Sequence, residues 1–113
     1  MQREAKTFLS EIQQSCLQLA IITAGKTLDD YANDRTMRGA VAWEFTMIGE
    51  NMGKLLKIAP EIGTSIPEAR KIVDFRNVLV HGYSGVAHDA VWDALTRQVP
   101  QLLHEVNALL AEE

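Results

Sequence analysis

The chain has 113 residues, 47% of them hydrophobic and 23% charged, which predicts one globular domain over residues 1–113 and argues against intrinsic disorder. The net charge of −4 argues against a protein that binds nucleic acid through its overall charge. Cys16 is the single cysteine, so no intramolecular disulfide can form and a reducing, cytoplasmic compartment is expected. Residues 17–24, the longest apolar stretch, are too few to cross a bilayer, and no secretory signal precedes them, so we expect no membrane association.

The charges are unevenly distributed along the chain. Residues 35–76 carry seven lysines and arginines against five acids, whereas residues 77–113 carry one arginine against five acids. The middle segment could therefore form a face that meets phosphates. A solvated helix surface with paired charges is the more ordinary interpretation of the same pattern.

Apolar residues recur every three or four positions along most of the chain, which predicts helices. The first helix carries its stripe from Phe8 to about Ile22, and Gly25 is expected to stop it. Residues 27–34 predict a turn or a short connecting helix.

A long amphipathic helix follows, with a stripe from Met37 to Ala59 and an end before Pro60. Ser65 and Glu68 then have the spacing of a capping box that would open the next helix. That helix is expected to bury the apolar run at 78–80.

Gly82 is expected to end the helix that contains residues 78–80, and the last helix begins at about His88. Pro100 lies within the last apolar stripe, so a kink is expected there rather than an end. No segment shows the sustained alternation of a strand. The predicted fold is therefore all-α, a compact antiparallel bundle of four main helices plus a short connecting helix.

Common cofactor and catalytic signatures are missing from the sequence. It contains no glycine-rich phosphate loop, no nucleophile elbow and no paired cysteines of a zinc site. The histidines at 81, 88 and 104 lack the spacing of metal ligands. We therefore expect neither a metal nor another cofactor.

Four reactive side chains, Arg76, Asn77, His81 and Tyr83, gather near the predicted end of a helix. A histidine can exchange protons near neutral pH, and an arginine can stabilise the growing charge of a phosphoryl group. Together they suffice in principle for metal-free cleavage of an RNA substrate, in which the 2′-hydroxyl attacks the neighbouring phosphate.

Helix geometry complicates this catalytic interpretation. Five residues turn an ideal helix by roughly 500°, so Arg76 and His81 would point about 140° apart. Either the helix unwinds at Gly82 and redirects His81, or the two side chains line opposite sides of a cleft, which a symmetric dimer could provide. The residues also fit structural roles, because Arg76 could pair with a carboxylate and His81 could favour the helix C-terminus.

The segment 75-FRNVLVHGY-83 occurs with 48-IGE-50, 66-IP-67, 85-GV-86 and 91-VW-92. In this combination the chain resembles the HepT family of HEPN-domain toxins over nearly its whole length. Glu68, Ser84 and Ala87 depart from the residues that are common in the family, and none of them is a proposed catalytic group.

The resemblance implies a HEPN-like helical domain that forms a homodimer and acts as a metal-independent endoribonuclease toxin. Arg76 and His81 would be its catalytic pair at the dimer cleft, and Asn77 a supporting polar residue. The partner would be a minimal nucleotidyltransferase antitoxin that adds AMP to Tyr83. The rival hypothesis is a non-catalytic helical module that docks a nucleotidyltransferase, and a purely structural dimer is a third. The role of Glu50 stays open, because it could also form an ordinary helix pair with Lys54.

Overall fold

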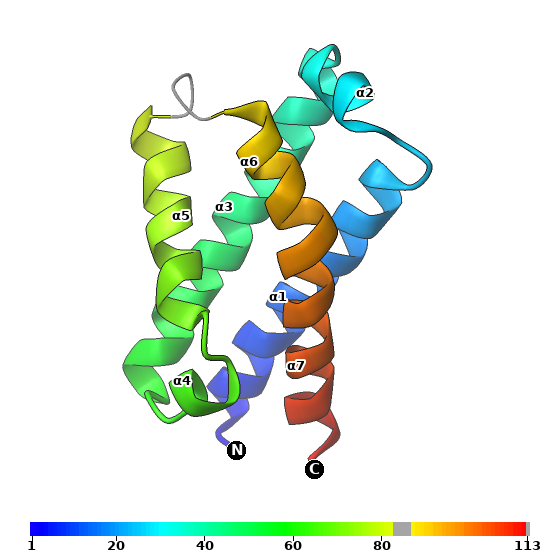
Figure 1. Cartoon of the computed structure of the whole chain (residues 1–113). Helices are drawn as coiled ribbons and strands as arrows, with labels where there is room; N and C mark the ends of the chain where they lie inside the picture. The colour runs from blue at the N-terminus through cyan, green and yellow to red at the C-terminus, as the bar shows by residue number, and fades with distance from the viewer. Residues whose placement is uncertain (83–86, 113) are drawn as a thin grey trace.

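The computed structural model describes residues 1–82 and 87–112, and within these residues it contains helices and no strand. Long helical rods lie side by side, with both termini at one end of the bundle (Figure 1). The expected all-α bundle is therefore confirmed. In chain order the elements are α1 (Arg3–Thr23), α2 (Leu28–Ala32), α3 (Arg35–Ile58), α4 (Ile62–Ser65), α5 (Ala69–Gly82), α6 (His88–Asp93), the π-helical segment η2 (Ala94–Gln98) and α7 (Val99–Ala111).

The first helix ends as its sequence predicts. α1 stops at Thr23, and Gly25 follows with a φ angle of 71°, a conformation that glycine adopts without steric cost. One face of α1 is buried along its length, and Leu9, Ile12 and Leu19 are among the buried residues of that face. The three-to-four-residue spacing of these side chains is the reason why the helix lies flat on its neighbours.

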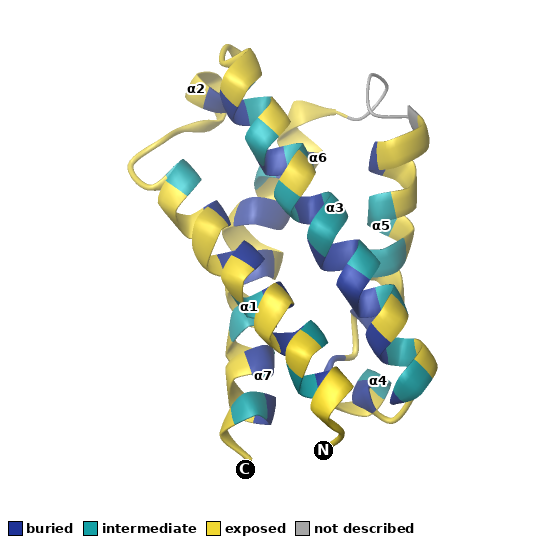
Figure 2. Cartoon of the chain, turned by 180° about the vertical axis from the view of Figure 1, so that it is seen from behind, coloured by how far each residue is buried: buried dark blue, intermediate teal, exposed yellow. Residues whose placement is uncertain are grey.

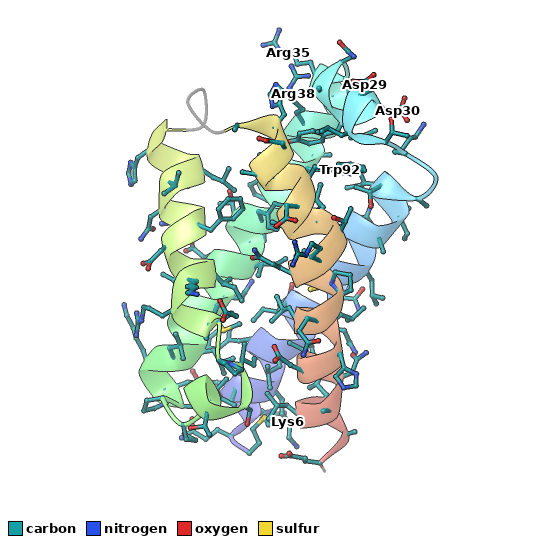
Figure 3. All side chains as sticks on the ribbon, viewed as in Figure 1. Lys6, Asp29, Asp30, Arg35, Arg38 and Trp92 are labelled. Atoms are coloured by element: carbon teal, nitrogen blue, oxygen red, sulfur yellow. The ribbon has the colours of Figure 1, made fainter. Side chains whose placement is uncertain are left out.

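The expected short connecting helix is α2, and it is capped at its start. The Asp30 N–H donates to the Thr27 hydroxyl oxygen, and the Thr27 N–H donates to the Asp30 carboxylate, which is a reciprocal capping box. Arg38 of α3 then donates to the carbonyl of Ala32 at 2.6 Å. Figure 3 shows Arg38 on the same end of the molecule as α2, where this bond holds the small helix against α3.

The predicted capping box at residues 65–68 is wrong. The Ile66 N–H donates to the carbonyl of Ile62, so Ser65 belongs to the separate turn α4 and is not extended as an N-cap would be. α5 begins only at Ala69, and the carbonyl of Glu68 accepts its first helical bond from Ile72.

The irregularity expected at Pro100 takes the form of a π turn. η2 ends two residues before Pro100 and joins α6 to α7 without a break in the helical rod. A proline has no N–H to donate and its ring crowds the carbonyl four residues earlier, so the wider π turn accommodates it. The apolar stripe stays in phase, because Val99, Leu102 and Val106 are all buried.

The core lies where α1, α3 and α7 face one another, and α5 packs on the other side of α3. Figure 2 shows buried residues along the inner faces of these helices. In the run at 78–80 only Leu79 is buried, whereas Val78 and Val80 are 51% and 48% exposed. The expectation that Val78 and Val80 belong to the core is therefore wrong, because α5 contacts the bundle through one narrow face.

In the part of the chain described, no helix is long and apolar enough to span a membrane.

Burial raises the pKa of the Cys16 thiol to about 12 from 9.0, because the thiolate would lose its hydration. We expect Cys16 in the native protein at pH 8 to react with a disulfide reagent about a thousandfold more slowly than in the unfolded chain. The free energy of unfolding should also fall as the pH rises from 9 towards 12, since only the unfolded chain releases this proton in that range.

Comparison with Cys16→Ala isolates this contribution, because the variant keeps all other titrating groups. Equal reaction rates in the native and the unfolded protein, or identical alkaline stability curves for the two proteins, would contradict the buried assignment.

Candidate active site

Gly49 allows α5 to approach α3 unusually closely at the position of Arg76. A Cβ atom placed on Gly49 would overlap the Cβ of Arg76 and lie 2.6 Å from its Cγ. The backbone of α3 therefore serves as the support for the aliphatic stem of Arg76, and only glycine leaves the required space. Phe45 and Phe75 reinforce the same helix pair with an edge-to-face ring contact at 5.2 Å.

The guanidinium of Arg76 is held by two side chains. Its Nη2 donates to the Glu50 carboxylate at 2.9 Å, and its Nη1 donates to the Asn77 amide oxygen at 2.9 Å. The Glu50 and Arg76 side chains are 40% and 28% exposed, so the ion pair lies at the surface without being fully solvated. Nε of Arg76 is buried and has no hydrogen-bond partner among the described residues. The orientation of the guanidinium is therefore fixed, while part of it stays accessible.

Glu50 is the site residue that sequence reasoning left undecided. The structure contains no ion pair between Glu50 and Lys54 among the residues it describes, and the Glu50 carboxylate binds Arg76 instead. The IGE triplet was the only sequence signal, because Glu50 and Arg76 are separated by 26 positions on different helices. Asn77, expected as a supporting residue, contacts Arg76 directly.

His81 is exposed in the last turn of α5, which continues to Gly82. Both His81 and Gly82 are helical, so the alternative in which the helix unwinds at Gly82 and redirects His81 is not what the described residues show. Ideal helix geometry places His81 about 140° around α5 from Arg76 and about 7.5 Å further along its axis. No hydrogen bond or ion pair joins His81 to Arg76 in the described part of the chain. Tyr83 lies outside the described residues.

An open groove extends from the Arg76–Glu50 pair along the contact between α3 and α5. It has a volume of about 370 Å³ and is lined by Glu50, Gly53, Lys54, Lys57, Arg70 and Arg76, together with Gly49, Leu56 and Val73. Among residues 1–82 and 87–112, no three His, Cys, Asp or Glu side chains come close enough to hold one metal ion. Four of the five charged side chains that line the groove, Lys54, Lys57, Arg70 and Arg76, are cations, and the one acid, Glu50, is paired with Arg76, so the groove suits an anionic ligand.

These features define a class of protein, a helical bundle whose surface presents an oriented arginine and an exposed histidine from one helix. The family model described as "Ribonuclease HepT-like" matches residues 12–109 of the chain. The chain belongs to this family of RNA-cleaving enzymes, which confirms the resemblance seen in the sequence.

Curated relatives of similar length carry ribonuclease names. "Putative RNase TTE0752" of Caldanaerobacter subterraneus subsp. tengcongensis is 27% identical over 96% of both chains. "Putative RNase MJ1380" of Methanocaldococcus jannaschii is 27% identical over 92% of this chain and 94% of its own. "Gamma-glutamylcyclotransferase and putative RNase MJ0434" of the same organism is 26% identical over 99% of this chain, which spans half of that protein. No solved structure matches the chain.

The contact at Gly49 generates a stability prediction. Gly49→Ala should lower the free energy of unfolding by about 1–3 kcal/mol, because the added methyl group overlaps Arg76 and forces α5 away from α3. Gly39→Ala is the matched control on the same helix, since nothing lies within 4 Å of its added Cβ. The control should raise the free energy of unfolding by about 0.5–1 kcal/mol through helix propensity.

Urea denaturation of both variants measures these changes. Equal stabilisation by the two alanines would show that the close approach at Gly49 does not exist in solution.

Proposed function

We propose that the protein is the toxin of a toxin–antitoxin pair and a metal-independent endoribonuclease whose catalytic residues are Arg76 and His81. The observation that carries this proposal is the fixed orientation of the Arg76 side chain together with the exposure of the His81 side chain. Arg76 is oriented by Glu50 and Asn77, and His81 is exposed on the same helix.

The chemistry follows from what these groups can do. The His81 imidazole removes the proton of an RNA 2′-hydroxyl, whose oxygen then forms a bond to the adjacent phosphorus. The bond from phosphorus to the 5′-oxygen breaks, and that oxygen takes up a proton. Arg76 stabilises the negative charge of the phosphoryl oxygens as the bonds change. The products are a 2′,3′-cyclic phosphate and a 5′-hydroxyl end.

A homodimer resolves the angular separation of the two residues. Because Arg76 and His81 point about 140° apart on α5, one chain cannot easily direct both at the same phosphate. A second copy related by a two-fold axis would bring the histidine of one chain opposite the arginine of the other.

Exposed apolar side chains flank the proposed catalytic arginine and support such an interface. Val80 follows Arg76 by one helical turn, and Trp43, which is 61% exposed, precedes Glu50 by two turns on the same face of α3. Large exposed apolar residues are typical of surfaces that contact another protein. The dimer interface would therefore cover the part of the α3–α5 face nearest the end of α5.

Regulation would come from a minimal nucleotidyltransferase antitoxin in the same cytoplasmic compartment. Tyr83 follows His81 by two positions, so AMP joined to its hydroxyl would add a negative charge and an adenosine close to the catalytic histidine. The added phosphate would repel the RNA backbone, and the adenosine would obstruct the cleft. These consequences make Tyr83 a suitable site for inactivation.

The proposed chemistry predicts that purified protein cleaves RNA in the presence of EDTA. Arg76→Ala and His81→Ala should each lower the cleavage rate by about 10²–10⁴-fold, because each removes one group acting in the transition state. Arg97→Ala is the control, since Arg97 pairs with Asp93 at the surface of η2. Undiminished cleavage by both active-site variants, with circular dichroism unchanged, would rule out Arg76 and His81 as the catalytic pair, whereas no cleavage by the wild-type protein would favour a docking module.

Mixing the two inactive variants tests the shared cleft. If arginine and histidine act across the two-fold axis, an equal mixture should regain about a quarter of the activity, because half of the dimers carry one intact site. No recovery after exchange of subunits would place each pair within a single chain.

Modification is predicted at Tyr83. Co-expression with the nucleotidyltransferase should increase the intact mass by one or more AMP units and abolish cleavage, and Tyr83→Phe should show neither change, since it lacks the hydroxyl. Tyr31→Phe is the matched control, because Tyr31 is wholly buried and out of reach of a partner enzyme. An AMP adduct that persists in Tyr83→Phe would assign the modification to another residue.

A further inference from the structure

The α3–α5 groove continues from Arg76 towards the opposite end of α5 from His81. α3 and α5 are antiparallel and in contact, so Lys57 near the end of α3 and Arg70 near the start of α5 line the same stretch of the groove. Lys54 lies between them and Glu50. Along the axis of α3, Lys54 and Lys57 are about 6 Å and about 10 Å beyond Glu50.

The cations of this stretch are uncompensated. Within the described residues, Lys54, Lys57 and Arg70 form no ion pair, and the one acid lining the groove, Glu50, is bound to Arg76. Two cations outside the groove are paired, since Lys71 contacts Glu68 at 3.2 Å and Arg97 contacts Asp93 at 3.3 Å. A chain with a net charge of −4 thus keeps a concentrated positive potential beside its arginine.

The floor of the groove is open between its cations. Its wall includes Gly53, and nothing lies within 4 Å of a Cβ placed there, so the surface between the cations is unobstructed. The apolar residues Trp43 and Val80 lie on the other side of the Arg76–Glu50 pair, so a second copy bound there would leave the basic stretch accessible.

We propose that Lys57 and Arg70, with Lys54, bind the phosphates of single-stranded RNA that neighbour the phosphate cleaved at Arg76. This inference rests on the proposed ribonuclease function and adds the path of the substrate to it. The strand would run along the groove from Arg76 to Lys57 and Arg70. Because lysine and arginine here contact phosphates and no bases, the affinity would be insensitive to sequence and sensitive to salt.

The test measures RNA binding without cleavage. A fluorescein-labelled 12-nucleotide single-stranded RNA of mixed sequence is titrated with His81→Ala protein and with the same protein carrying Lys57→Gln and Arg70→Gln. We expect the dissociation constant to rise about tenfold in 100 mM KCl. The slope of log affinity against log salt should fall by about 1.4, since each phosphate contact on a single strand contributes about 0.7.

The matched control carries Lys71→Gln and Arg97→Gln, which remove two cations that are already paired and do not line the groove. It should keep the affinity and the salt slope. The charge-conserving pair Lys57→Arg and Arg70→Lys should also keep the slope, which a purely structural role of these residues would not explain. Circular dichroism verifies the fold of each variant.

The outcomes separate this inference from the proposed function. Equal affinity and equal salt slope for the groove variant and the Lys71/Arg97 control would overturn the RNA path. So would a groove variant that binds RNA normally and loses binding to the nucleotidyltransferase, because the groove would then be a protein-docking surface. Salt-dependent RNA binding through the groove by a wild-type chain that cleaves no RNA would contradict the ribonuclease mechanism and leave the path intact.

Discussion

The stem of Arg76 lies directly on the backbone of α3 because residue 49 has no side chain. This contact fixes the distance between the two helices and places the Arg76 guanidinium within 2.9 Å of the Glu50 carboxylate. It also determines where the groove opens, since α3 and α5 share its walls. A site built on two packed helices is more rigid than one built on loops, which suits the proposed role of Arg76 in stabilising charge at a fixed position.

The ion pair between Glu50 and Arg76 raises the question of why a proposed catalytic cation should be partly neutralised. The guanidinium of an arginine has five N–H donors, and Glu50 and Asn77 each accept from one of them. The partners restrict the rotation of a long side chain, so less conformational entropy is lost when a phosphate binds. The carboxylate also keeps the arginine in place when no RNA is present.

Most of the helical framework could be predicted from the sequence, because apolar periodicity and the stop at Gly25 are local signals. The turn α4 could not, since Ser65 and Glu68 have the spacing of a capping box, whereas the bond from Ile66 to Ile62 makes Ser65 helical. The exposure of Val78 and Val80 was missed for a related reason. Spacing shows that α5 has an apolar side, but the width of its contact with the bundle depends on tertiary packing.

The site was only partly predictable. The reactive residues on α5 stand out in the sequence, but the partner that orients Arg76 lies 26 positions away on another helix. Charge counting indicated a basic middle segment, yet only the structure shows which of its cations are paired and which line the groove. Local patterns thus indicated which side chains are candidates, whereas their arrangement around Arg76 comes from long-range packing.

Both termini emerge at one end of the bundle, and α5 ends at the other (Figure 1). A second domain joined to either terminus would therefore extend away from His81 and would not obstruct the end of α5. This arrangement makes the fold suitable as a module in longer polypeptides. This chain spans half of one relative, which is named for a cyclotransferase as well as an RNase. Attachment of a second domain at a terminus is compatible with a protein of that length and name.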